Sequence, residues 1–215
     1  MTNPRYFHTT LLICSLIFIA CLLMAGPMRG GMPVAGDLPT RLLFIEQQLA
    51  LWQLGWLLWM GCALGLMLFA CLLATALPNG VLRSVGLTLV CLGIVPDLTA
   101  ETLYAFVLPQ LAQQGAALDS LQLLDHLAMF LTGFLGNGLY NLGGLLLTVE
   151  LWRCQPALRR WLWPGVMAWL LGLGLSASIA LQQLLAAELL TAASMTLSTL
   201  WFAAIAWKLW GKPSV

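Results

Sequence analysis

Six stretches of the chain are long enough and apolar enough to cross a membrane as helices. They lie at about residues 10–25, 49–77, 82–108, 127–152, 161–181 and 189–210. A helix needs about 20 mostly apolar residues to cross a hydrocarbon core of about 30 Å. Turn-forming residues such as those at 78–80 separate the stretches. The pattern therefore predicts an all-α polytopic membrane protein, in which residues 1–215 form a single domain of six transmembrane helices in one bundle.

Composition supports this prediction and excludes other classes of protein. Hydrophobic residues make up 61% of the 215 residues and charged residues only 8%, whereas an ordinary soluble domain has about 25% charged residues. The formal net charge is +1. These values exclude a soluble globular protein, a disordered chain, and a nucleic-acid-binding protein that acts through a basic surface. The partner that the composition predicts is the lipid bilayer.

The basic residues predict the orientation of the helices, because Lys and Arg concentrate in cytoplasmic loops. With the N-terminus inside, only Arg29 and Arg41 face outwards, and seven basic residues face the cytoplasm: Arg5, Arg83, Arg153, Arg159, Arg160, Lys208 and Lys212. That bias requires an even number of spans. Both termini are therefore predicted to be cytoplasmic, in a bacterial-type inner (plasma) membrane. An alternative for residues 10–25 is a cleaved signal peptide, although Leu23 is unsuitable for a cut after Ala25.

Small residues predict where helices contact one another, because they let helix backbones approach closely in lipid. They recur every four residues at Gly61 and Gly65 in the second stretch, and in the fifth stretch at Ala168, Gly172, Ser176 and Ala180. We expect these faces to pack inside one bundle. Self-association into a homo-oligomer is the alternative.

Two acidic residues in the third stretch mark a candidate functional site, because ionisable groups at membrane depth are costly. Asp97 and Glu101 are four residues apart and share a helix face, which Tyr104 extends. Counted from Leu82 at about 1.5 Å per residue, Asp97 lies roughly 22 Å and Glu101 roughly 28 Å along the helix. Asp97 is therefore predicted in the outer half of the membrane and Glu101 near its outer boundary.

The fourth stretch carries a polar stripe of its own. Its polar and small residues fall within a sector of roughly 100° around the helix: His126, Gly133, Asn137, Tyr140, Asn141, Gly144 and Thr148. The preceding residues 117–125 place acidic residues opposite leucines, which predicts an amphipathic helix on the outer surface. Since consecutive antiparallel helices meet on the outer side, we expect Asp97, Glu101 and His126 to come together there.

These three residues allow three interpretations. An Asp, a Glu and a His suit a divalent metal ion. They could instead relay protons, with Asp97 as the titrating group. In a structural role, Asp97 would cap the helix that restarts after Pro96. Glu46 is a further candidate acid. Because the chain contains no HExxH, phosphate-loop or GxSxG motif, it predicts no particular metal or cofactor.

The leading hypothesis is a membrane protein with an outward-facing polar pocket between the third and fourth spans. The pocket would bind or transport a small molecule, ion or lipid headgroup, with a cation favoured by its acids. Its ligand-binding residues would be Asp97, Glu101, Tyr104, His126, Asn137, Tyr140 and Asn141. Two alternatives stay open. One is an intramembrane enzyme that uses His126 and a carboxylate on a lipidic substrate, and the other is an accessory or assembly subunit of a membrane complex.

Overall fold

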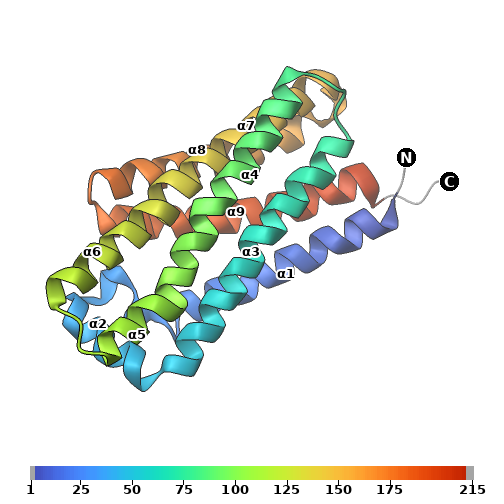
Figure 1. Ribbon diagram of the computed structural model, residues 1–215. Helices are drawn as coiled ribbons and strands as arrows, with labels where there is room; N and C mark the ends of the chain where they lie inside the picture. Colours follow the sequence, from blue (N-terminus) through green and yellow to red (C-terminus); the bar gives the residue numbers. More distant parts are fainter. Residues whose placement is uncertain (1–2, 212–215) are drawn as a thin grey trace.

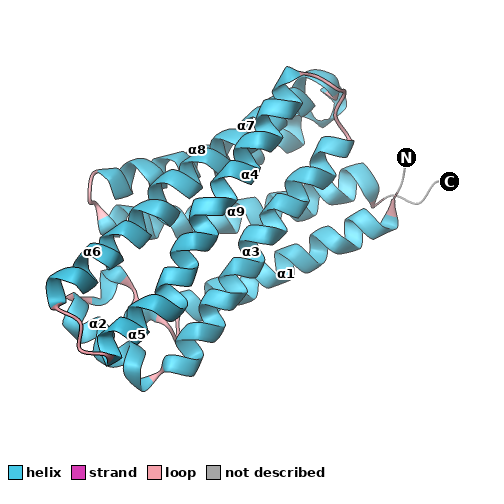
Figure 2. Cartoon of the chain, in the orientation of Figure 1, coloured by secondary structure: helices cyan, strands magenta, loops and turns pink. Residues whose placement is uncertain are grey.

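The computed structural model describes residues 3–211, and within that range all regular secondary structure is helical. Short loops join the helices, as Figure 2 shows. The predicted all-α fold is confirmed. The α-helices are α1 (Pro4–Ala25), α2 (Leu38–Gln47), α3 (Leu49–Thr75), α4 (Val81–Thr102), α5 (Leu108–Gln113), α6 (Leu118–Met129), α7 (Asn137–Cys154), α8 (Arg159–Ala180) and α9 (Leu184–Trp210).

Two of the long rods in the bundle each consist of several helical segments that follow one another without a loop. α4 runs through a π-helical segment, η3 (Leu103–Val107), into α5, and α6 runs through a second one, η4 (Phe130–Gly136), into α7. Counted this way, the described residues pass along the bundle six times. The start of α1 and the end of α9 lie at the same end of the bundle as the α3–α4 and α7–α8 turns (Figure 1). We call this the terminal end, and the opposite end, where α2 and α5 lie, the α2 end.

Five helices within residues 3–211 are long and apolar enough to cross a membrane: Pro4–Ala25, Leu49–Thr75, Val81–Gln113, Pro156–Ala180 and Leu184–Trp210. The remaining rod, α6–η4–α7, is more polar, since it carries Asp125, Asn137 and Asn141. The fold is thus a bundle of apolar helices of membrane-spanning length. The predicted count of six spans and the cytoplasmic position of both termini remain predictions.

The amphipathic helix predicted on the outer surface at 117–125 is instead the first part of the rod that forms the fourth pass. Leu121 and Asp125 are buried, and α6 continues without a break into η4 and α7. The physical reason is that Arg41 of α2 pairs with Asp125. This pairing satisfies the carboxylate inside the protein, so the residue does not need water.

Glycines bring α4 and α7 into direct backbone contact. A Cβ atom at Gly93 would lie 2.7 Å from the carbonyl oxygen of Gly136, and one at Gly86 would lie 3.0 Å from that of Gly143. Because real Cβ atoms do not approach backbone so closely, no larger residue fits without moving a helix. The third and fourth passes therefore touch backbone to backbone at these two points.

The other small residues also make contacts inside the bundle. A Cβ atom at Gly61 would lie 3.1 Å from Leu16 of α1, and one at Gly65 would lie 3.2 Å from Ile13. On α8, Ala168, Gly172 and Ser176 are buried. The prediction that these faces pack within one bundle is confirmed for these residues.

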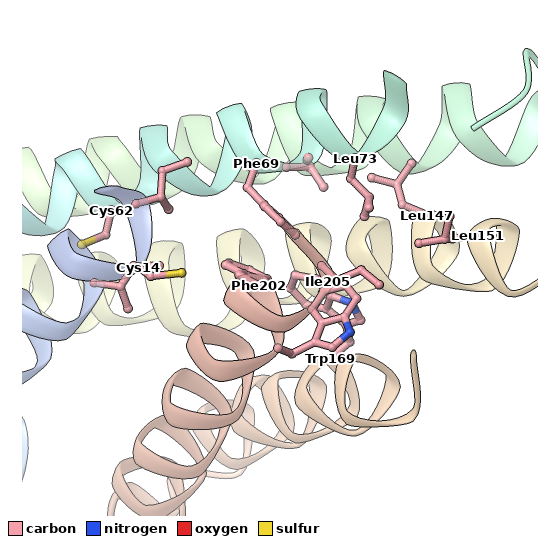
Figure 3. Packing of buried hydrophobic residues seen from close by; sticks show 14 of the residues in the cluster. Cys14, Cys62, Phe69, Leu73, Leu147, Leu151, Trp169, Phe202 and Ile205 are labelled. Atoms are coloured by element: carbon pink, nitrogen blue, oxygen red, sulfur yellow. The ribbon is translucent and has the colours of Figure 1, made fainter. Parts of the chain in front are cut away.

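Two aromatic clusters fill the bundle, one towards each end. The terminal cluster consists of Phe69 of α3, Trp169 of α8, and Trp201 and Phe202 of α9. Phe69 and Phe202 stack with 3.9 Å between ring centroids, and Figure 3 shows how the side chains of three helices converge there. The α2-end cluster consists of Trp52 and Trp56 of α3 and Tyr104 of η3. In it, the Trp56 and Tyr104 rings stack at 4.7 Å.

Candidate functional site

A cavity of about 60 Å³ lies near the middle of the bundle and is lined by all six passes. On α3, its lining residue Cys62 falls between Trp56 of one aromatic cluster and Phe69 of the other. A single water molecule needs a cavity of about 10–15 Å³, so this one suits a few waters or a small ion and is too small for a lipid headgroup. Its polar lining residues are Asp97, Asn137, Tyr140, Asn141, Ser194 and Ser198.

Asp97 lies at the centre of its rod. It is the seventeenth of the 33 residues from Val81 to Gln113, because the helix does not end near residue 108 but continues through η3 and α5. Its position in the outer half of the membrane stays a prediction. Asp97 is only 3% exposed, and the hydroxyl of Thr132 in η4 donates a hydrogen bond to its Oδ1.

Glu101, one turn further along α4, is completely buried. Neither of its carboxyl oxygens has a hydrogen-bond partner among the described residues, and it is not among the residues that line the cavity. A buried carboxylate without a partner is very costly, and the group must be neutralised in some way. Glu101 therefore requires a bound proton or a bound cation.

Within residues 3–211, no basic side chain forms an ion pair with Asp97 or Glu101. The ion pairs within residues 3–211 lie elsewhere: Arg29–Glu188, Arg41–Asp125 and Arg153–Glu150. Two carboxyl groups one helical turn apart thus share the interior without a counter-ion.

The two predicted carboxamides face α8 rather than α4. Asn137 Nδ2 donates to the Gly172 carbonyl at 2.6 Å and to Ser176 Oγ at 2.8 Å. Asn141 Nδ2 donates to the carbonyl oxygen and to Oδ1 of Asn137, at 2.7 and 2.8 Å. These bonds engage both amide groups and fix which way each carboxamide points. The Asn137 bonds hold α7 against α8, and the Asn141 oxygen packs against Gly172 of α8.

The serine hydroxyls of α9 are engaged in the same way. Ser194 donates to the carbonyl oxygen of Ala168 at 3.3 Å, and Ser198 donates to that of Met195 at 3.2 Å. Two other lining residues, Tyr140 and Trp59, carry a hydroxyl and an indole N–H that form no hydrogen bond within residues 3–211. The acid in the lining, Asp97, favours a positively charged occupant over an anion.

Tyr104, a predicted ligand residue, belongs to the α2-end aromatic cluster and does not line the cavity. Its hydroxyl donates to the Asp125 carbonyl at 3.2 Å, and its own carbonyl accepts from Trp52 Nε1 at 2.7 Å. It lies three residues beyond Glu101 towards the α2 end. Tyr104 therefore packs on the α2-end side of the two acids, outside the cavity.

The ion pair between Arg41 and Asp125 was not predicted. The guanidinium forms two hydrogen bonds to the carboxylate, at 2.9 and 2.8 Å, and its Nε donates to the Gly31 carbonyl at 3.0 Å. Both side chains are less than 10% exposed. The sequence carries one indication that Asp125 is buried. It lies four residues after Leu121 and three before Ala128, so it shares a helix face with these apolar residues, which are buried.

The predicted convergence of His126 with Asp97 and Glu101 is wrong. His126 is exposed on α6, because its neighbour Asp125 occupies the buried face and adjacent residues on a helix point about 100° apart. Glu46 is exposed as well. Among residues 3–211, no three His, Cys, Asp or Glu side chains are grouped closely enough to hold a metal ion. The interpretation as a divalent-metal site therefore has no support in this part of the chain.

Comparison of the chain with protein-family models, with curated proteins and with solved structures finds no match. The function is therefore inferred from the residues and their geometry alone.

Proposed function

We propose that this is an integral membrane protein that binds a small cation beside Asp97, one helical turn from Glu101, and carries it across the membrane. In the orientation that the basic residues predict, the α2 end faces outwards from a bacterial-type plasma membrane. The observation that carries the proposal is the pair of buried carboxyl groups that have no counter-ion within residues 3–211, next to a cavity of about 60 Å³.

The charge and the size of the site both support a small cation. A purely structural role for the acids would require partners for them, and Glu101 has none among the described residues. A metabolite or lipid headgroup would need more space than the cavity offers. Acids inside a membrane protein commonly mark ion pathways and proton relays.

The backbone around the acids supports the same proposal. η3 begins two residues after Glu101, and η4 contains Thr132, the hydrogen-bond partner of Asp97. π-helical turns are rare and occur frequently at functional sites. The two π-helical segments, η3 and η4, thus both lie next to the acidic pair.

The alternatives have less support. The enzyme hypothesis needs His126 as acid or base, but this side chain is exposed and the acids lie inside the bundle. The accessory-subunit hypothesis does not explain why Asp97 and Glu101 are buried without an ionic partner within residues 3–211.

Calorimetric titration of the purified protein in lipid nanodiscs with NaCl, KCl and NH₄Cl tests the proposal. We expect saturable binding of at least one of these cations. Asp97→Asn keeps an acceptor for Thr132 but removes the charge, so binding should weaken about tenfold or more. Uptake of the bound cation into proteoliposomes then tests transport.

Glu150→Gln is the matched control. Glu150 is an acid at the terminal end, where it pairs with Arg153 at 3.5 Å, and its loss should leave cation binding unchanged. Absence of binding by the unmodified protein, or equal binding by the Asp97→Asn variant, would contradict the proposal.

A further inference from the structure

The two acids of the site have different surroundings. Asp97 lines the cavity and accepts a hydrogen bond from Thr132. Glu101 is fully buried, does not line the cavity, and has no partner within residues 3–211. An ion that enters the cavity meets Asp97 first, whereas Glu101 lies one turn beyond it. When two acids are held in unlike environments, they can take different roles in one mechanism.

Among the described residues, no group that faces Glu101 supplies positive charge. On its own helix the nearest titratable groups are Asp97 and Tyr104. From the helices packed against α4, Cys62 of α3 and Tyr140 of α7 lie close enough to sense its charge. η4 has no titratable residue. On α6, Asp125 is already paired with Arg41, and His126 is exposed. With the cavity empty, only a proton can neutralise Glu101.

We propose that the protein exchanges a cation for a proton, with Glu101 as the proton carrier and Asp97 as the entry ligand for the cation. This inference rests on the proposed function. In the empty state Asp97 is ionised and Glu101 is protonated. When a monovalent cation settles beside Asp97, its charge stabilises ionised Glu101 one turn away, and the Glu101 O–H bond breaks to release a proton. One positive charge enters and one leaves, so the net charge of the site stays the same.

The measurement is proton release from the unmodified protein in a weakly buffered nanodisc suspension, read with a pH dye as NaCl, KCl or NH₄Cl is added. We expect about one proton per bound cation and an affinity that falls about tenfold for each unit decrease in pH over the range in which Glu101 titrates. Difference infrared spectra of the same sample should lose the carbonyl band of a protonated carboxyl group when the cation binds.

Glu101→Gln separates the two proposals. This variant should still bind the cation but release no proton, and its affinity should no longer depend on pH in that range. Proton release that persists in Glu101→Gln, or cation binding by the unmodified protein without proton release, would overturn the exchange while leaving the cation site intact. Failure of the unmodified protein to bind any of the three cations would overturn the proposed function itself. If Glu101→Gln does not fold, the infrared band of the unmodified protein decides the question.

Discussion

The Asn141 side chain occupies the space in which a side chain on Gly172 would have to lie. Gly172 also supplies the backbone carbonyl that accepts from Asn137. α7 and α8 can therefore pack this closely beside the cavity because Gly172 has no side chain. Cores that are packed in this way do not accept added volume without strain.

We expect Gly172→Ala to destabilise the protein by about 1–3 kcal/mol, because the new methyl group displaces Asn141 and breaks its hydrogen bonds to Asn137. Thermal unfolding in detergent measures the effect. Gly174→Ala is the control on the same helix, since a Cβ atom there would meet Leu190 at an ordinary 3.5 Å. Equal unfolding temperatures for the two variants would show that the Asn141 position does not matter.

The burial of single residues follows the helical period and could be predicted in part. Asp97 and Glu101 share one face of α4, and both are buried as that period predicts. The helical period could not show which of the neighbours Asp125 and His126 is buried, because both lie at the edge of a polar face. Asp125 is the buried one because it pairs with Arg41, which lies 84 residues away in the chain.

α2 is held against α6 by the buried ion pair of Arg41 and Asp125. Loss of one partner leaves the other charge buried and unpaired, so we expect Arg41→Gln to destabilise the protein by about 3–5 kcal/mol. Thermal unfolding of the purified variants checks this value. The double variant Arg41→Met, Asp125→Leu should recover most of the loss, since it leaves no unpaired charge.

Arg29→Gln is the control for this prediction. Arg29 pairs with Glu188 at the same end of the bundle, but its side chain is 56% exposed. Exposed pairs contribute about 0–1 kcal/mol, so this variant should unfold close to the unmodified protein. A loss as large as that of Arg41→Gln would mean that burial does not set the strength of these pairs.

The pairing of helix faces shows what the sequence could not predict. The small and polar face of the fourth stretch was expected to meet the third stretch. Its glycines meet α8 instead, with Gly133 against Ile179 and Gly144 against Trp169, and Asn137 and Asn141 turn to α8 as well. The glycines that meet α4 are Gly136 and Gly143, which lie outside the predicted face. A helical period reveals which residues share a face, whereas the partner of that face depends on the rotation of every other helix. The central cavity arises from all six passes, so no single stretch could indicate it.

The six passes bring the start of α1 and the end of α9 to the terminal end of the bundle (Figure 1). Cys154, an exposed residue at the end of α7, lies there too. In a variant with Cys154 as its only cysteine, a membrane-impermeant maleimide should label intact cells poorly and inverted vesicles well. Ser120→Cys, introduced at the exposed start of α6 in a variant without other cysteines, should give the opposite result. Labelling of both positions from one side would refute the six-span topology.

We also expect the rate of Cys154 labelling to depend on pH. Desolvation and the nearby Glu150 carboxylate raise the pKa of the Cys154 thiol. The reactive thiolate is therefore scarce near neutral pH, and labelling should accelerate as the pH rises. Glu150→Gln removes one of these causes and should speed labelling at neutral pH. An unchanged rate would show that the carboxylate does not act on the thiol.

The positions of the two aromatic clusters set a kinetic limit on any ion movement through this protein. With Phe69 and Phe202 stacked towards the terminal end and Trp56 and Tyr104 stacked towards the α2 end, aromatic side chains lie along the bundle on both sides of the cavity. An open channel lets many ions pass for each opening. The proposed cation carrier would instead have to rearrange these aromatic contacts for every ion, so we expect slow turnover and little leakage of the membrane potential.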